Sequence, residues 1–270
     1  MNDALRERFR PPSQVLNLSE PFRAMIDLGV LHLSEPWLNS LIGGDGHPVL
    51  VVPGFTTGDR STVVQRKFLS SLGYLPCGWK QGVNFGIRHE AFEGLSRLLI
   101  QLNEKYDCRV SLVGQSLGGI YARELAKLQP DRVRQVITLG SPFNDPEGDA
   151  SNVTRLYEMF NPEQKGKNAQ FSSENWNIAA APPVPTTAIY SKWDGICHWR
   201  ACLQYGGHDR IENIEVASSH TGMGVNAQTL FVVADRLSQR RHSWEPFHLG
   251  RYFGIPRATS SDIPFSEKTA

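Results

Sequence analysis

A serine flanked by glycines lies between a predicted strand and the predicted helix that follows it. The segment Gly114-Gln115-Ser116-Leu117-Gly118 follows the apolar strand predicted over 109–113 and precedes a stripe of apolar residues at helical spacing. A strand that turns at once into a helix needs small flanking residues, and it presents the serine where backbone N–H groups stabilise negative charge. The glycine patterns of phosphate-binding loops are absent. We therefore predict that Ser116 is a nucleophile.

A serine hydroxyl becomes a good nucleophile when a base takes its proton, and the chain offers eight histidines. His220 follows the last predicted strand and precedes the final predicted helix, in Ala217-Ser218-Ser219-His220-Thr221-Gly222. The carboxyl ends of parallel strands share one edge of a sheet, so we expect His220 at the same edge as Ser116. His198 and His208, which also lie in predicted loops, are the alternatives.

The base in turn needs an acid that holds its tautomer and stabilises the imidazolium. Asp194 follows the fifth predicted strand in Tyr190-Ser191-Lys192-Trp193-Asp194-Gly195. The chain order serine, acid, histidine is that of the hydrolases built on a strand-to-helix serine turn. Asp194 before Gly195 also suits an ordinary turn. Asp145, in the loop after the fourth predicted strand, is the alternative acid.

Acyl transfer further requires hydrogen-bond donors for the negative oxygen that develops on the substrate carbonyl. The backbone N–H of Leu117, directly after the serine, is one expected donor. The second is expected from the loop after the first strand, Pro53-Gly54-Phe55-Thr56-Thr57-Gly58, as the N–H of Phe55 or Thr56.

The hydrophobic pattern predicts an α/β fold with a mostly parallel sheet of about six strands covered by helices. Pro76 places the second strand at a sheet edge. The predicted strands are 48–52, 74–80, 109–113, 133–139, 186–190 and 214–217, and helices are predicted within 61–72, 89–106, 120–128 and 226–237.

Three regions flank or interrupt this alternation. Residues 1–45 are expected to form an N-terminal helical extension of two short helices, because Ser19-Glu20-Pro21 and Ser34-Glu35-Pro36 both have the pattern of a helix start. The core is expected over 46–240, with an insertion at 143–185 that is typical of a lid or binding loop. Residues 241–270 are expected to be a tail.

These motifs resemble those of the α/β-hydrolase superfamily, in particular its lipase and esterase branch, over residues 47–240. Many lipase-like members have histidine where this chain has Pro53. Many also have histidine directly before the serine, where this chain has Gln115. The markers of the resemblance are Val52-Pro53-Gly54-Phe55, Gly114-Gln115-Ser116-Leu117-Gly118-Gly119, Tyr190-Ser191-Lys192-Trp193-Asp194-Gly195 and Ser219-His220-Thr221-Gly222. The resemblance implies hydrolysis through an acyl-Ser116 intermediate, with neither a metal nor an organic cofactor.

The expected substrate is a small neutral carboxylic ester, because no basic cluster flanks the site to recruit a phosphorylated or CoA-bearing acyl group. Phe55, Phe143 and Trp193 are the expected substrate contacts. The aromatic residues of the insertion, Phe171 and Trp176 among them, either line an acyl pocket or pack the insertion onto the core. Two other functions stay open: an acyltransferase with the same three residues, and a binding module without activity.

The amino-acid composition disfavours several other classes of protein. The 270 residues hold 28 Lys and Arg against 27 Asp and Glu, and this balance disfavours a nucleic-acid binder driven by overall charge. The charged N-terminus does not resemble a secretory signal, and no apolar run is long enough to span a membrane. The four cysteines include no Cys-x-x-Cys pair, which disfavours a zinc site and predicts free thiols in a cytoplasmic protein.

Overall fold

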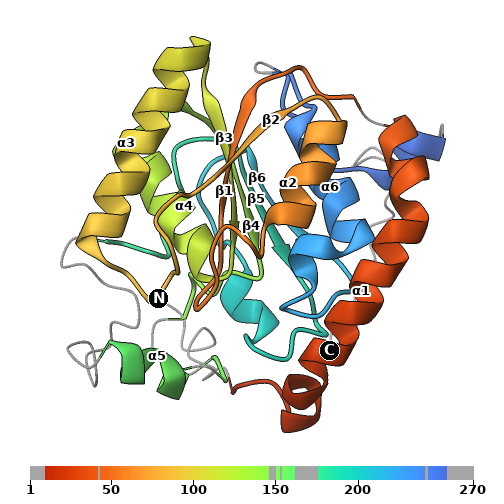
Figure 1. Ribbon diagram of the computed structural model, residues 1–270, viewed down its shortest axis with the longest axis vertical. Coiled ribbons are helices and arrows are strands. Elements are labelled where there is room, and N and C mark those ends of the chain that lie inside the picture. Colours follow the sequence, from red (N-terminus) through yellow and green to blue (C-terminus); the bar gives the residue numbers. More distant parts are fainter. Residues whose placement is uncertain are drawn as a thin grey trace, which may run out of the picture.

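The strands in the centre of the sheet are buried at almost every position, as strands covered on both faces must be. Six of them run parallel in one sheet, in the order β2-β1-β3-β4-β5-β6 (Figure 1). They are β1 (Pro48–Val52), β2 (Leu75–Gly78), β3 (Val110–Gln115), β4 (Val133–Leu139), β5 (Thr186–Tyr190) and β6 (Ile211–Glu215). The computed structural model describes residues 10–41, 43–145, 150–152, 154–161, 176–240 and 243–253.

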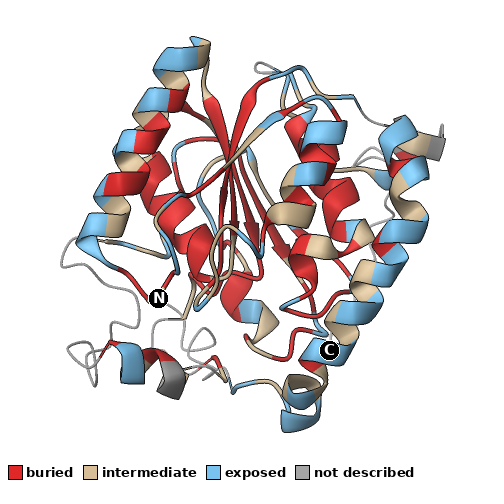
Figure 2. Cartoon of the chain, in the orientation of Figure 1, coloured by how far each residue is buried: buried red, intermediate tan, exposed pale blue. Residues whose placement is uncertain are grey.

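Helices cover both faces of this sheet (Figure 1), and two apolar clusters fill the space between the layers. One cluster joins the sheet to α3 and α4, and the other joins it to α2, α6 and the inner side of α1. Figure 2 shows the buried strands between these layers. The helices are α1 (Gln14–Leu41), α2 (Val63–Ser71), α3 (His89–Tyr106), α4 (Leu117–Leu128), α5 (Thr154–Phe160) and α6 (Ala227–Leu237).

The order of the strands indicates where a ligand-binding crevice lies. β1 pairs with β2 on one side and with β3 on the other, so the connections that leave β1 and β3 diverge. In open parallel sheets, ligands bind outside the carboxyl ends of the strands at such a switch point. The loop with Phe55 and the turn with Ser116 follow these two strands.

The prediction of a six-stranded parallel sheet with an N-terminal helix is confirmed, and β2 is an edge strand as expected. β6 lies further towards the N-terminus than the predicted 214–217. It is the other edge strand, and Ile214 is its one buried residue. Because β6 is a half-exposed edge strand, it lacks the continuous apolar run that predicts a strand.

The expectation of two short helices in the N-terminal extension is wrong, because α1 is one helix of 28 residues. Pro21 and Pro36 both lie inside it. The Ser19 hydroxyl does not cap a new helix but donates to the Leu16 carbonyl at 3.0 Å, within the same helix. Contacts of the inner side of α1 with the body outweigh these local signals. Residues 1–9 of the extension, 254–270 of the tail and 162–175 of the insertion, including Phe171, lie outside the described residues.

Leu31 tests whether α1 is an integral part of the fold. Its side chain is 1% exposed in the cluster beneath α1 and α6, whereas Leu33 on the same helix is 86% exposed. Leu31→Ala should lower the free energy of unfolding by about 2–5 kcal/mol, because it leaves a cavity. Leu33→Ala, the matched control, should change it by less than about 0.5 kcal/mol. Urea unfolding measures both, and equal effects would show that α1 is not docked as described.

Candidate active site

Ser116 occupies a strained turn between β3 and α4. Its backbone has φ +50° and ψ −123°, a region that residues with side chains rarely adopt. The Ser116 N–H donates to the Leu139 carbonyl of β4 at 2.8 Å, which ties the turn to the neighbouring strand. A Cβ at position 118 would lie 2.3 Å from the Val52 carbonyl, so Gly118 is needed where α4 passes β1. These contacts hold the serine at the carboxyl end of the sheet.

Asp194 lies buried in the loop after β5. Its Oδ1 accepts hydrogen bonds from the backbone N–H groups of Ile196, at 2.8 Å, and Cys197, at 2.7 Å. Its Oδ2 lies 2.6 Å from Nδ1 of His220. The N–H donors offset part of the cost of removing this carboxylate from water, and they aim its second oxygen at the ring.

His220 lies buried in the loop between β6 and a short 3-10 helix, η5 (Met223–Val225). Gln115, which precedes the serine, donates through Nε2 to the His220 carbonyl at 2.9 Å. Burial lowers the pKa of His220, but the negative charges of Asp194 and Glu20 outweigh it, so that the pKa is raised from its usual value. With Nδ1 directed at Asp194, Nε2 is left to face the pocket.

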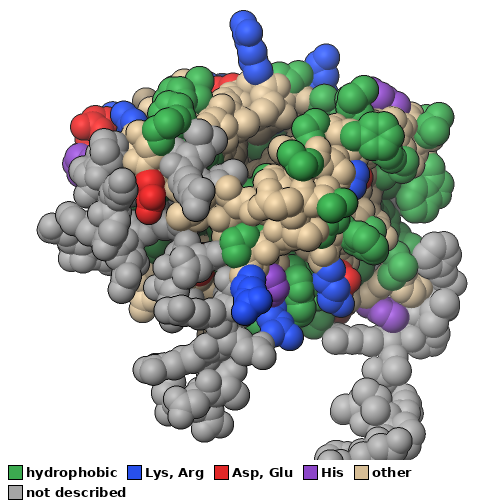
Figure 3. All heavy atoms as spheres, turned by 90° about the horizontal axis from the view of Figure 1, so that it is seen from below, with side chains coloured by type: hydrophobic (Ala, Val, Ile, Leu, Met, Phe, Trp, Pro, Cys, Tyr) green, Lys and Arg blue, Asp and Glu red, His purple; other side chains and the backbone are tan. Residues whose placement is uncertain are grey.

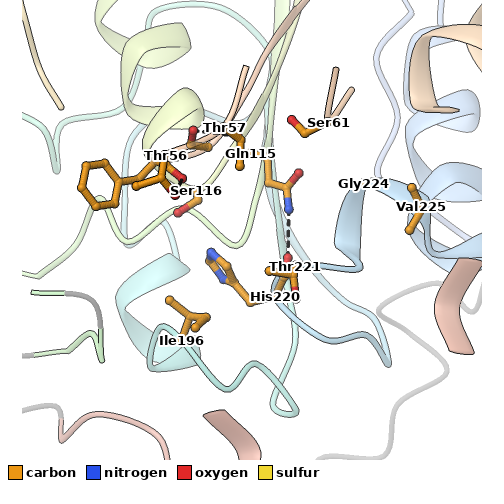
Figure 4. A pocket seen from close by; sticks show the side chains of 12 residues that line it. Thr56, Thr57, Ser61, Gln115, Ser116, Ile196, His220, Thr221, Gly224 and Val225 are labelled. Carbon is orange, nitrogen blue, oxygen red and sulfur yellow. Dashed lines mark hydrogen bonds between the residues drawn. The ribbon is translucent and has the colours of Figure 1, made fainter. Parts of the chain in front are cut away.

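The serine and the imidazole line the same pocket, of about 190 Å³, and Figure 4 shows the His220 ring turned towards the Ser116 side chain. Between these two described residues the structure holds no direct hydrogen bond, and in empty sites such bonds are often long. The lining residues are Gly54, Phe55, Thr56, Thr57, Ser61, Gln115, Ser116, Ile196, His220, Thr221, Gly224 and Val225.

Of the three backbone N–H groups expected to stabilise the oxyanion, one already donates a hydrogen bond within the protein. The Thr56 N–H donates to the Asn84 carbonyl at 2.7 Å and is therefore occupied. For the N–H groups of Phe55 and Leu117, the described part of the chain contains no hydrogen-bond partner. Asn84 also donates through Nδ2 to the Pro53 carbonyl at 2.9 Å, which fixes the loop after β1. Phe55 and Leu117 are the available pair.

Of the expected substrate contacts, the structure brings Phe55 to the pocket and places Phe143 and Trp193 elsewhere. Phe143 is buried, with its ring 3.6 Å from the guanidinium carbon of Arg123, so it covers a buried cation in the core. Trp193 is exposed on the surface, and its carbonyl accepts a hydrogen bond from Arg23 of α1. Neither ring is directed into the pocket.

The insertion reaches the pocket through Phe55. The Phe55 ring centroid lies 5.2 Å from that of Tyr157 and 6.1 Å from that of Phe160, both in α5. Phe160 also stacks on Phe85. Trp176 instead packs against Phe92 of α3, away from the pocket lining. The insertion thus both packs onto the body and borders the site through α5.

The alternative acid and bases make other contacts. Asp145 accepts a hydrogen bond from the Ala150 N–H at 3.0 Å. His198 accepts from the Arg200 N–H at the start of a 3-10 helix, η4 (Trp199–Cys202). His208 lies 2.9 Å from the Pro182 carbonyl through Nε2. The structure brings Asp194 and His220 together and records none of these three side chains in the pocket lining.

Glu20 of α1 is a site residue that the sequence analysis missed. Its buried carboxylate accepts hydrogen bonds from the N–H groups of Gly195, at 2.8 Å, and His220, at 3.0 Å. It also accepts from the N–H and the hydroxyl of Thr221, at 2.9 and 2.6 Å. One side chain therefore joins the loop of the acid to the loop of the histidine. A lone glutamate between Ser19 and Pro21 has no sequence signal for this role.

Asp27, two turns further along α1, holds the same histidine loop. Its Oδ2 accepts from the N–H and hydroxyl of Ser219, and its Oδ1 accepts from Asn226 at 2.8 Å. Gly195 shows how closely α1 approaches, because a Cβ there would lie 2.4 Å from the Leu16 carbonyl. The glycine after Asp194 thus makes room for the helix.

Among the residues that the structure describes, no group of His, Cys, Asp and Glu is arranged to hold a metal ion. Over the same residues, no helix combines the length and the apolar character required to cross a lipid bilayer.

Comparisons with known proteins agree with this architecture. A family model described as a PGAP1-like alpha/beta domain matches residues 89–222. Aspergillus fumigatus lipase B superposes with a TM-score of 0.54 at 18% identity, over 75% of this chain and 57% of that one, so the chain spans little more than half of that lipase. No curated protein matches the sequence.

Two other solved structures are covered more fully. An alpha/beta superfamily hydrolase from Oenococcus oeni PSU-1 has a TM-score of 0.52 at 14% identity, over 71% of this chain and 91% of that one. Bacillus licheniformis lipase BlEst2 has a TM-score of 0.51 at 13% identity, over 72% and 93%. At such identities the likeness shows the fold. The chain has the fold of the α/β hydrolases.

The charge of Glu20 should be measurable at the His220 ring. Glu20→Gln should lower the pKa of His220, because the variant removes a negative charge that stabilises the imidazolium while Asp194 stays in place. The ring should then titrate at a lower pH, as followed by NMR of its carbon-bound protons. Glu35→Gln, on the same helix, is the control and should leave the titration unchanged. An unchanged or raised pKa in Glu20→Gln would contradict the described placement of this carboxylate.

Proposed function

We propose that this chain is a serine hydrolase that cleaves carboxylic esters through an acyl-Ser116 intermediate. The observation that carries the proposal is the 2.6 Å contact between His220 Nδ1 and Asp194 Oδ2, with His220 and Ser116 in one pocket. An imidazole held by a buried carboxylate, in one pocket with a half-buried serine hydroxyl, is the arrangement that activates a serine.

In the first half-reaction, Nε2 of His220 takes the proton of the Ser116 hydroxyl while Oγ attacks the ester carbonyl carbon. The carbonyl oxygen becomes negative and accepts hydrogen bonds from the N–H groups of Phe55 and Leu117. The imidazolium, stabilised by Asp194, then donates its proton to the leaving alcohol oxygen as the C–O bond breaks. The acyl group is now an ester of Ser116.

In the second half-reaction, water replaces the alcohol. Nε2 takes a proton from water as its oxygen attacks the acyl carbonyl carbon. The proton returns to Ser116 Oγ as the bond to the acyl group breaks, which releases the carboxylic acid. In each half-reaction, the imidazole of His220 takes up one proton and gives it back.

A neutral ester fits the pocket best. The side chains of Phe55, Ile196 and Val225 supply apolar surface, and the lining residues include no Lys or Arg to pair with a phosphate or carboxylate. Among the described residues, the pocket lining offers no cation to a phosphorylated or CoA-bearing acyl group.

Ser116→Ala tests the nucleophile. The variant should lose hydrolysis of a short p-nitrophenyl ester by about 10⁴-fold or more in kcat, because no alkoxide can form. It should also lose covalent labelling by a fluorophosphonate probe. Ser61→Ala, which removes another hydroxyl from the same pocket, is the control and should keep both. Labelling that persists in Ser116→Ala would assign the reactive group to another residue.

Asp194→Asn tests the acid. The substitution should lower kcat by about 10⁴-fold, since the amide favours the wrong imidazole tautomer. Asp145→Asn keeps an oxygen that can accept from the Ala150 N–H and should lower kcat by less than about tenfold. Steady-state kinetics on the same ester compares the two variants. The reverse ranking would move the acid to Asp145.

A further inference from the structure

α1 is apolar on both sides: its inner side carries Leu31 and Leu38 beside two buried or half-buried carboxylates, and its outer side is apolar as well. Its acidic side chains at positions 20 and 27 are directed at the protein, where they bind the histidine loop. Its outer face, formed by Val15, Leu18, Phe22, Met25, Ile26 and Leu33, is exposed to solvent. The spacing of these six residues places them on one stripe along the helix. In Figure 3 hydrophobic side chains gather on the side where Figure 1 places α1.

The outer face is uncharged as well as apolar. Between Val15 and Val30, no exposed position holds Asp, Glu, Lys, Arg or His. Further along the helix, the side chains of His32 and Glu35 are 65% and 39% exposed and lie 3.9 Å apart. The large side chains of this face are mostly exposed: Leu33 is 86% exposed, Leu18 81%, Met25 72% and Phe22 67%. A contiguous exposed apolar surface of this kind marks a site of interaction with a protein or a membrane.

We infer that the outer face of α1 docks the protein on an uncharged lipid surface, with its apolar side chains among the acyl chains. The exposed residues between Val15 and Val30 carry no charge, which complements a lipid phase that carries no net charge. Between Val15 and Val30 the exposed residues offer no side-chain hydrogen bonds that would set the register of a protein partner. A fluid lipid surface also adapts to a convex helix, whereas a rigid partner needs a matching groove.

One exposed tryptophan lies beside α1, and a second lies in α1 near its C-terminal end. Trp193 is exposed beside the N-terminal half of α1, where its carbonyl accepts the hydrogen bond from Arg23, and Trp37 is half-exposed near the other end. Indole rings favour the boundary between water and acyl chains. Trp193, predicted as a substrate contact, is assigned here to the docking surface.

The inner side of α1 adjoins the pocket. Its first turns pack against Gly195, whose neighbour Ile196 lines the pocket. In a molecule docked through the outer face, the helix therefore lies between the lipid and this edge of the pocket. The inference does not rest on the proposed function, because binding to lipid requires no reaction at Ser116.

Flotation with vesicles of neutral phosphatidylcholine tests the docking surface on the full chain. The wild-type protein should float with the vesicles. The triple variant Leu18→Ser, Phe22→Ser and Met25→Ser should partition at least about tenfold less, because it removes most of the apolar side-chain surface that enters the lipid. Leu128→Ser is the matched control: Leu128 is 60% exposed at the C-terminal end of α4, and its loss should not change flotation.

Several results would overturn the inference. A wild-type chain that stays in the aqueous fraction at all lipid concentrations would do so without any variant. An equal loss of flotation in Leu128→Ser would also overturn it. Light scattering that shows a dimeric wild type and a monomeric triple variant would assign the face to a second copy of the chain instead. Ser116→Ala should float like the wild type, so failure of the proposed hydrolysis and failure of lipid docking are separate observations.

Discussion

The contact between the carboxylate of Asp194 and the imidazole of His220 is the interaction around which the site is built. Both side chains are buried, and a buried imidazole on its own resists protonation. The carboxylate reverses this tendency, and the pKa of His220 is raised. The carboxylate itself is stabilised by the N–H groups of Ile196 and Cys197, so neither charge is left without partners.

This contact requires two loops to hold a fixed relation, and α1 supplies it. The loops follow β5 and β6, which are neighbours in the sheet, but the sheet positions only their first residues. Beyond that point Glu20 binds backbone N–H groups from both loops, and Asp27 binds the histidine loop a second time. Since backbone N–H groups are the main donors, α1 orients the path of the chain and leaves the ring of His220 free to contact Asp194.

How much of this could be predicted from the sequence depends on whether the cause is local. The central strands and the turn at Ser116 were predictable, because doubly covered strands are apolar runs and a tight turn demands small residues such as Gly118. The edge strand β6 was displaced, since only one of its residues is buried. The single helix α1 was missed because its tertiary contacts outweigh two local start signals.

Side-chain direction and long-range partners lie beyond such patterns. Phe143 and Trp193 follow strands β4 and β5 closely enough to border a pocket, yet one turns into the core and the other to the surface. Glu20 joins residues 175 and 200 positions away, a relation that no local pattern contains. The pattern of α1 does not reveal it either, because both sides of the helix carry apolar residues and only packing decides which side faces the body.

The position of Glu20 also bears on how the imidazole would act as a base. A second negative charge near His220 stabilises the imidazolium, but it cannot take the place of Asp194, because its oxygens are occupied by N–H groups and by Thr221. Nδ1 therefore keeps a single acceptor, and the tautomer stays defined. The raised pKa has a cost, since a larger fraction of the ring is protonated and unable to act as a base at neutral pH. In the proposed reaction, the gain would be an imidazolium of lower free energy in the transition state, when the proton leaves the serine.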